Sequence, residues 1–193
     1  MPDAAADYPF VVAIGGSAGA LDAMIELLAE VPAGLPVPIV LALHSMPDAR
    51  LIRPLELKLP HDMHEITEGE TLRPGHLHVA PAARHVFFRN DTLHLSDPVE
   101  DSGFRPSIDA LFMTLATTWG DRAIGVVLSG LLQDGMRGAQ VLYDLGGRTL
   151  VQDPDYADYD EMPLAVIRND HPDRILPAAD LGRWITRVVE AAA

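Results

Sequence analysis

Three polar side chains each follow a short apolar run of the sequence, and their types are suited to acyl-transfer chemistry. Ser17 lies in GGSAG, His44 begins HSMP, and Asp134 lies in SGLLQDG. Such runs, bounded by Gly or Pro, are typical of strands buried in a parallel sheet. The carboxyl ends of parallel strands share one edge of the sheet, where α/β proteins bind their ligands. The sequence therefore predicts a hydroxyl, an imidazole and a carboxylate at one edge, which are the parts of a nucleophile, its base and the acid that orients the base.

Each of these residues also has a purely structural interpretation. Glycines on either side of Ser17 are common in the turn after a first strand. An imidazole at the end of an apolar strand, as at His44, is more often a packed or capped histidine than a catalytic base. Asp134 precedes Gly135 and a helical pattern, so its carboxylate could simply cap a helix. The convergence of the three loops favours the catalytic interpretation.

Other titratable residues are weaker candidates for a site. His61 and His64 are three residues apart, and His76 and His78 alternate as on one face of a strand, so either pair could bind Zn²⁺. Neither pair has a third ligand at a diagnostic spacing, and we expect solvated histidines. The acidic run 153–161 lacks the glycine and the positions of an EF-hand, which favours a surface loop.

Apolar runs and helical patterns alternate along most of the chain. Strands are expected at residues 10–14, 39–43, 123–128 and 148–151. Helices are expected at about residues 20–31, from the N-cap Ser107 to about Trp119, at 136–145, at MPLAVIR and at AADLGRWITRVVEAA. This order predicts an α/β fold with a parallel doubly wound sheet covered on both faces.

The middle of the chain has a different pattern. Between Met63 and Ser96 the segments are short, rich in Thr, His, Val and Phe, and interrupted by Gly and Pro. LHVAP and HVFFRNDTLHL are read as strands, the second as a hairpin around Arg89-Asn90-Asp91. We expect an antiparallel hairpin extension on one edge of the sheet, within a single domain that covers residues 1–193.

Composition limits the classes of function. Hydrophobic residues make up 48% of the 193 residues and charged ones 22%, which allows a sizeable core. The absence of cysteine excludes disulfides, thiolate catalysis and Cys-ligated metals. The net charge of −14 argues against nucleic-acid binding. The segment MPDAAADYPF is no signal peptide and no apolar stretch is long enough for membrane insertion, so we expect a cytoplasmic protein.

The first loop also allows a rival interpretation. Strand, GGSAGA and helix in this order are similar to a dinucleotide-binding unit. The glycine spacing is not G-x-G-x-x-G, and the second strand ends in His44 instead of an acid for the ribose. No Gly-Lys-Ser/Thr follows for a phosphate loop. Nucleotide binding is therefore the second class of function, and we expect no cofactor.

Six segments together resemble the catalytic domain of CheB-type chemotaxis protein-glutamate methylesterases. They are VAIGGSAGALDAM, LALHSMP, GETLRPGHLHVAPAARHV, FRPSIDALF, AIGVVLSGLLQDGMRGAQVLYDLGG and TLVQDPDYADYDEMPLAVI, in the order of that family and over most of the chain. The resemblance implies a modified Rossmann-like sheet and a catalytic triad of Ser17, His44 and Asp134. It also implies hydrolysis of glutamate methyl esters on chemoreceptors, and in some members deamidation of receptor glutamines.

The implied mechanism assigns a task to each residue. His44 takes the proton of Ser17 during attack on the ester, and Asp134 orients and stabilises the imidazolium. The oxyanion requires two donors, for which we expect the N–H of Ala18 and one from the 129–133 loop, with Gly16 and Leu131 as further candidates for this part of the site. Methoxide leaves more readily than an amine, so esterase activity is expected before deamidation.

Three departures from the family pattern concern these loops. Leu132 stands where the family loop usually has a second glycine, which matters if the position needs a positive φ. Ala18 replaces a residue that is often Thr or Ser, and the segment after His44 reads HSMPDARL where H-M-P-P or H-L-P-P is usual. A catalytically impaired regulatory or binding module of the same fold is the alternative that these changes raise.

The resemblance finally implies partners. We expect methyl-accepting chemoreceptors as substrates, and no nucleic acid. Residues 1–193 carry no receiver-domain pattern, so we expect a free-standing catalytic domain. Its control by a separate protein such as a response regulator, and substrate proteins other than chemoreceptors, are both left open by the sequence.

Overall fold

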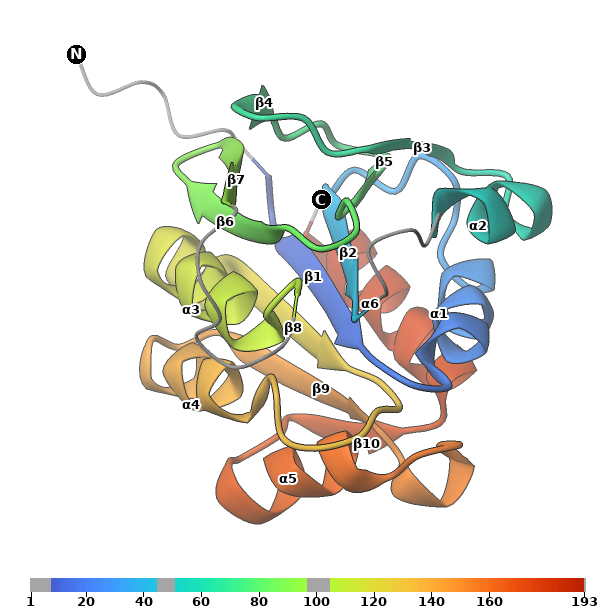
Figure 1. The fold of residues 1–193 in the computed structure, drawn as a ribbon. Coiled ribbons are helices and arrows are strands. Elements are labelled where there is room, and N and C mark those ends of the chain that lie inside the picture. Colours follow the sequence, from blue (N-terminus) through green and yellow to red (C-terminus); the bar gives the residue numbers. More distant parts are fainter. Residues whose placement is uncertain (1–7, 45–50, 97–104, 193) are drawn as a thin grey trace.

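The computed structural model describes residues 8–44, 51–96 and 105–192. Its centre is a parallel sheet of seven strands in the order β10-β9-β8-β1-β2-β5-β3 (Figure 1). The strands are β1 (Val11–Gly16), β2 (Ile39–Leu43), β3 (Asp62–Glu65), β5 (His76–Val79), β8 (Ala123–Val127), β9 (Arg148–Gln152) and β10 (Arg174–Leu176). The chain builds outward from β1 through β2, and β8 then pairs with the other side of β1. The strand order therefore reverses at β1, which is where the ligand crevice of such sheets lies.

Helices cover both faces of this sheet. They are α1 (Ala20–Ala29), α2 (Ile52–Lys58), α3 (Ile108–Trp119), α4 (Met136–Asp144), α5 (Glu161–Asn169) and α6 (Ala178–Ala192), and two 3₁₀ turns span Gly120–Arg122 and Pro154–Tyr156. Val12 and Ile14 of β1 belong to the core under α1 and α6, whereas Val11 and Ala13 belong to the core under α3, α4 and α5. Burial on both faces explains why the central strands are continuously apolar in sequence.

A second, antiparallel sheet lies on the α3 side of the molecule (Figure 1). It contains β4 (Glu70–Thr71), β7 (Thr92–Ser96) and β6 (His85–Arg89) in that order. The predicted hairpin is confirmed: β6 and β7 are joined by Asn90 and Asp91, and Asn90 has a φ of 55°. Asn and Asp tolerate this left-handed conformation better than other non-glycine residues.

The placement of the hairpin differs from the expectation. It does not extend the main sheet, because Val86 and Phe88 of β6 are buried in the core that includes α3, and the Phe88 N–H donates to Thr114 Oγ1 (3.1 Å). The LHVAP strand, β5, instead pairs in parallel with β2 and β3 and belongs to the main sheet. The fold class, α/β with a parallel doubly wound sheet, is confirmed.

Most predicted elements lie where the sequence patterns place them. Helix α3 begins after Ser107, whose Oγ accepts the Ala110 N–H (3.2 Å) as expected for an N-cap. Strand β3 was not predicted, because its sequence DMHE has no apolar run and its side chains are only half-buried or exposed. Within the described ranges, no helix is both long and apolar enough to cross a bilayer.

Candidate active site

The register of the central strands brings Ser17 and His44 to neighbouring positions. Gly16 and Leu43 are partners in the β1–β2 ladder, so the next residue on each strand is Ser17 and His44. The His44 N–H donates to the Gly16 carbonyl (3.0 Å), and the Ser17 N–H donates to the carbonyl of Ser129, just after β8 (2.9 Å). Backbone hydrogen bonds thus join the loops after β1, β2 and β8 at the carboxyl edge of the sheet.

Two glycines allow the backbone around Ser17 to pack closely. A Cβ at Gly15 would lie 2.4 Å from Ile108 Cγ2, at the start of α3. A Cβ at Gly130 would lie 2.9 Å from Ser17 Cβ. Neither position has room for a larger residue, so the serine loop is confined between the start of α3 and the loop after β8.

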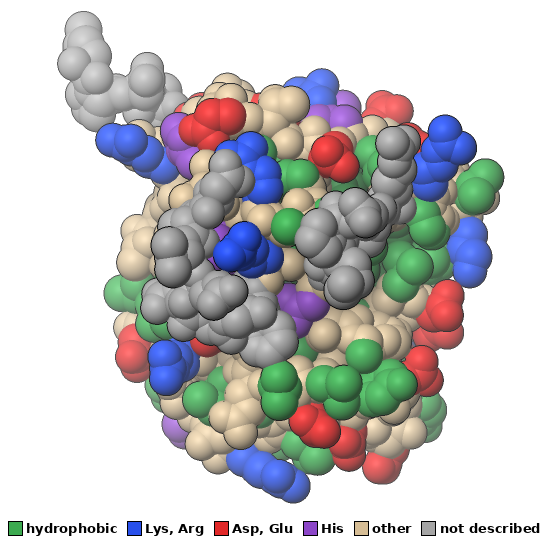
Figure 2. Space-filling model, viewed as in Figure 1, with side chains coloured by type: hydrophobic (Ala, Val, Ile, Leu, Met, Phe, Trp, Pro, Cys, Tyr) green, Lys and Arg blue, Asp and Glu red, His purple; other side chains and the backbone are tan. Residues whose placement is uncertain are grey.

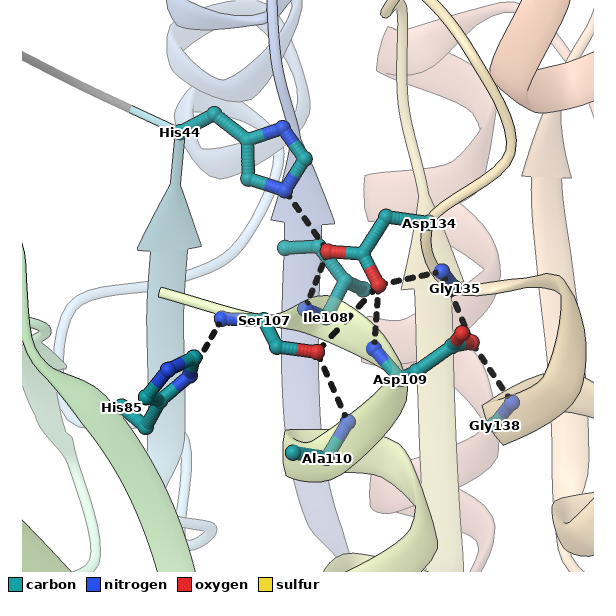
Figure 3. A network of polar contacts seen from close by, with 9 residues as sticks. All are labelled: His44, His85, Ser107, Ile108, Asp109, Ala110, Asp134, Gly135 and Gly138. Carbon is teal, nitrogen blue, oxygen red and sulfur yellow. Dashed lines mark hydrogen bonds and ion pairs between the residues drawn. The ribbon is translucent and has the colours of Figure 1, made fainter. Parts of the chain in front are cut away.

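The second and third candidates are in direct contact. His44 Nε2 lies 2.7 Å from Asp134 Oδ2, and the two side chains are 9% and 1% exposed (Figure 3). A carboxylate can only accept, so the neutral imidazole carries its proton on Nε2 and a lone pair on Nδ1. This is the tautomer that a histidine needs in order to accept a proton at the nitrogen remote from the acid.

Asp134 is held by the start of α3. Its Oδ2 accepts the Ile108 N–H (2.7 Å), and its Oδ1 accepts the N–H groups of Asp109 (2.9 Å) and Gly135 (3.1 Å). Burial raises the pKa of Asp134, but the hydrogen bonds from His44, Asp109 and Ile108 outweigh burial and hold the pKa below its usual value. Asp134 is therefore an anion that caps a helix, as the structural interpretation anticipated. The capped helix is α3, and α4 follows Asp134 in sequence.

Two amides of these loops are available to a ligand. The N–H groups of Ser17 and Gly130 donate to Ser129 and Tyr159 carbonyls, whereas those of Ala18 and Leu131 have no acceptor among the described residues. Ala18 and Leu131, which the sequence suggested for this role, are therefore retained as the candidate oxyanion donors. Gly16 is a strand residue whose carbonyl accepts from His44, so its contribution is to position the loops.

Leu132, which stands where the family loop usually has a glycine, adopts the left-handed backbone conformation that glycine favours. Its φ is 69°, its side chain is 52% exposed, and its N–H donates to Glu161 Oε2 (2.9 Å). A positive φ is strained for a residue with a branched side chain. The loop thus retains a conformation that favours glycine. The altered segment after His44 falls on residues 45–50, which lie outside the described residues.

Sequence reasoning missed the residue that ties the acidic run to the serine loop. Ser129 Oγ donates to the Ala18 carbonyl (2.8 Å) and accepts the Tyr159 N–H (3.0 Å), and the Ser129 N–H donates to Gln152 Oε1 (2.8 Å). Residues 153–161 are thus more than the surface loop that was expected, because their backbone supports the nucleophile loop. Serine is too common in loops for this role to be evident from sequence.

The face around these loops is partly apolar. Figure 2 shows hydrophobic and acidic side chains side by side over the loop after β8 and α5. Leu131, Leu132 and Tyr159 are 39%, 52% and 45% exposed. A cavity of about 560 Å³ adjoins this loop, and its lining includes Leu132, Asp134 and, from α5, Arg168. These features offer a surface for a protein segment beside the site.

Two of the four histidines that were expected to be solvated, His61 and His78, are buried, whereas His64 and His76 are partly exposed. His61 is 9% exposed and its Nε2 donates to the Val31 carbonyl (2.9 Å). His78 is fully buried, and its Nδ1 lies 2.6 Å from Glu70 Oε1, which also lies 2.8 Å from His64 Nε2. Only the tertiary structure supplies Glu70 as a third group of metal-ligating type beside the two histidines.

Arg73 argues against a metal ion in this cluster. The Arg73 N–H donates to His78 Nε2 (3.1 Å), and Arg73 Nη2 lies 2.9 Å from His64 Nδ1 and 3.3 Å from His64 Nε2. Because His78 Nε2 accepts from Arg73, the ring proton of His78 lies on Nδ1 and points to Glu70. A metal ion at His78 Nδ1 would force this proton onto Nε2, against the Arg73 N–H, and the Arg73 guanidinium beside His64 adds a positive charge. The cluster is therefore a hydrogen-bonded support that joins β3, β4 and β5.

Comparison with known proteins agrees with the geometry. The family model described as CheB methylesterase matches residues 12–185. A protein-glutamate methylesterase/protein-glutamine glutaminase of Moorella thermoacetica is 35% identical over an alignment of 191 residues that covers 94% of this chain and 45% of the relative. A relative of the same name, numbered 4, from Myxococcus xanthus is 34% identical and is matched over 51% of its length. The chain thus spans about half the length of these curated relatives.

A solved structure supports the same assignment. The crystal structure of the Thermotoga maritima CheB methylesterase catalytic domain has a TM-score of 0.87 to this chain, with 25% sequence identity. The similarity covers 93% of this chain and 98% of that domain. Family model, relatives and fold agree over nearly all of the described residues. The chain therefore belongs to the CheB methylesterase family.

Proposed function

We propose that this chain hydrolyses glutamate methyl esters on chemoreceptor proteins, with Ser17 as nucleophile, His44 as base and Asp134 as orienting acid. The observation that carries the proposal is the buried 2.7 Å contact between His44 and Asp134, beside the loop that contains Ser17. The names of the relatives support the substrate class. Helix α3, through its amides, keeps Asp134 ionised, as the acid of a triad must be.

The reaction proceeds in two half-reactions. His44 Nδ1 takes the hydroxyl proton as Ser17 Oγ attacks the ester carbonyl, and the tetrahedral intermediate collapses to an acyl-serine while His44 protonates the departing methoxide. Methanol leaves. A water molecule then attacks the acyl-serine with His44 again as base, and the glutamate carboxylate and the Ser17 hydroxyl are released.

The developing oxyanion is bound by backbone donors. The N–H groups of Ala18 and Leu131 are the candidates, because the neighbouring amides of Ser17 and Gly130 donate within the protein. Preorganised donors of this kind commonly contribute about 10²–10³-fold to the rate. Leu132, with its positive φ, follows Leu131 directly and is part of the same turn.

The ester is the better substrate for this chemistry. Methanol is a much stronger acid than ammonia, so methoxide leaves a tetrahedral intermediate more readily than an amide ion. Hydrolysis of a glutamine side chain by the same residues requires His44 to protonate the nitrogen before it leaves. Deamidation is therefore proposed as the slower activity.

The other two interpretations are less well supported. A nucleotide site would need an acid at the end of β2, where His44 instead contacts Asp134. A catalytically impaired module would have no need for a buried, ionised acid against an imidazole. The strained backbone of Leu132 is the observation that favours such a module, and a measurement of ester turnover distinguishes it from an active esterase.

Labelling with a fluorophosphonate probe is the direct test. The native protein should be labelled at Ser17, as mapped by mass spectrometry, while Ser17→Ala and His44→Ala should not be labelled although both keep the native circular dichroism spectrum. A methylated receptor fragment should release methanol with the native protein only. A folded native protein that neither reacts with the probe nor releases methanol would exclude the esterase.

A further inference from the structure

We propose that Asp109 is a positioning residue of the active site, which holds Asp134 in place by capping the helix that Asp134 precedes. The inference rests on the proposed function, since it assigns a residue to that reaction. Asp109 lies in the first turn of α3 and does not contact His44 or the serine loop in any bond of the described residues. Its effect is therefore exerted through the backbone of another element.

The contacts of Asp109 reach the start of α4. Its Oδ1 accepts the N–H groups of Gly135 and Gly138, both at 2.9 Å. Gly135 is the N-cap of α4, with a φ of 97° and no side chain to cap the helix itself. Asp109 therefore satisfies the Gly138 N–H, and it shares the Gly135 N–H with Asp134 Oδ1 (3.1 Å), at a helix start whose first N–H groups have no partner within the helix.

Asp134 does the same in the opposite direction. It accepts the N–H groups of Ile108 and Asp109 at the start of α3 (Figure 3). The two helix starts thus exchange carboxylates: Asp109 of α3 caps α4, and Asp134, one residue before Gly135, caps α3. Since one peptide bond joins Asp134 to Gly135, a shift of Gly135 displaces the carboxylate that orients His44.

Close packing makes this exchange sensitive to side-chain length. A Cβ at Gly138 would lie 2.5 Å from Phe112 Cβ and 3.0 Å from the Asp109 carbonyl oxygen. Helices α3 and α4 are therefore as close here as a glycine permits. A side chain longer than Asp at position 109 would push against Gly135, and a shorter one would not reach it.

The electrostatic cost of this carboxylate also indicates a specific task. Burial raises the pKa of Asp109, and the neighbouring charge of Asp134 raises it further, while the N–H groups of Gly138 and Gly135 act in the opposite direction. Two carboxylates side by side repel each other. The arrangement is retained because each carboxylate satisfies the start of the other's helix.

The test compares three substitutions at one position with a control elsewhere. Asp109→Ala removes the acceptor, and we expect kcat for the methyl ester and the probe-labelling rate to fall about 10- to 100-fold, because misplacement by about 1 Å of a reacting group can cost about 10²-fold. KM should stay within about twofold. Asp109→Asn keeps an oxygen that can accept the N–H groups of Gly135 and Gly138, so kcat should stay within about fivefold of native.

The control is Asp173→Ala. Asp173 Oδ2 accepts the Thr149 N–H (2.9 Å) at the start of β9, away from the three loops of the site. The loss of this hydrogen bond should lower the melting temperature about as much as Asp109→Ala does, and it should leave kcat unchanged. If Asp109→Ala does not fold, Asp109→Glu replaces it, because one added methylene displaces Gly135 while the charge remains, and the same loss of kcat is expected.

The outcomes separate this inference from the proposed function. A native protein that is active, with Asp109→Ala or Asp109→Glu folded and within twofold of its kcat, would overturn the inference alone. Equal losses in Asp109→Asn and Asp109→Ala would also overturn it, since charge and not capping would then matter. A native protein without esterase activity and without labelling removes the proposed function and this inference together.

Discussion

Histidine–carboxylate contacts of nearly equal length occur in different parts of this molecule. His44 and Asp134 are 2.7 Å apart at the carboxyl edge of the sheet, and His78 and His64 lie 2.6 and 2.8 Å from Glu70 beside the outer strands. The length of the contact does not distinguish a catalytic pair from a structural one.

The second nitrogen of each ring makes the difference. In the outer cluster, the Arg73 N–H donates to His78 Nε2, so the His78 ring is committed as a donor to Glu70, and the Arg73 guanidinium lies against both nitrogens of His64. In the central pair, the amides at the start of α3 hold Asp134, and Figure 3 shows the second nitrogen of His44 on the side of the ring away from Asp134. A base needs a nitrogen on the side of the ring away from its acid, and His44 Nδ1 has that placement.

The largest expected effect comes from Asp134→Asn. Both oxygens of the carboxylate accept hydrogen bonds: one from His44 and Ile108, the other from Asp109 and Gly135. Whichever oxygen is replaced, the NH₂ group of the asparagine faces another donor. His44 would shift its proton to Nδ1, the wrong tautomer for a base, and kcat should fall about 10⁴-fold, as in other serine hydrolases. Steady-state kinetics of methyl-ester hydrolysis measure the change in kcat, and a loss below tenfold would contradict the assignment of Asp134 as the acid of the triad.

Glu70→Gln is the matched change in the outer cluster. Both carboxylate oxygens of Glu70 accept hydrogen bonds, one from His64 and His78 and the other from the Thr67 N–H (2.8 Å). An amide cannot accept on both sides, so the free energy of unfolding should fall by about 1–2 kcal/mol. Urea denaturation measures this loss. The kcat should remain native, and a marked loss of kcat in the folded variant would break the comparison.

The pH dependence of stability should separate the two regions. Burial lowers the pKa of His78 below its ordinary value of 6.5, whereas Asp134 and Glu70 have lowered pKa values and remain ionised far below that pH. Below pH 6.5 the unfolded chain binds the His78 proton first, so the free energy of unfolding falls as the pH drops toward the folded pKa. Urea unfolding at about pH 7.5, 6.5 and 5.5 should show a smaller decline in His78→Gln than in the native protein. An equal decline in both proteins would remove His78 as the cause.

The smallest expected effect concerns the loop beside the central pair. Leu132→Gly relieves a positive φ of 69° at a side chain that is 52% exposed, and the strain released exceeds the added flexibility of the unfolded chain. The free energy of unfolding should rise by up to about 1 kcal/mol. Leu131→Gly, at the neighbouring residue without a positive φ, should not stabilise the protein. Thermal unfolding of the two variants makes the comparison.

Local sequence patterns were sufficient for the fold class and for most elements of the central sheet. The apolar runs, the glycine turns and the N-cap at Ser107 are each specified by neighbouring residues. Placement of Ser17, His44 and Asp134 at one edge also followed from sequence, because the ends of parallel strands must share an edge. The short polar strand β3 and the position of the hairpin did not follow, since both depend on what packs against them.

What only the tertiary structure decided is which groups meet across long stretches of chain. From sequence, Asp134 would cap the helix after it, yet it caps α3, and Asp109 caps α4 in exchange. Glu70 becomes the partner of His64 and His78, and the Arg73 N–H then determines which nitrogen of His78 carries the proton. Each outcome depends on how closely helices and strands approach one another. Secondary structure follows from neighbours in sequence, whereas the chemistry of a carboxylate or an imidazole follows from its neighbours in space.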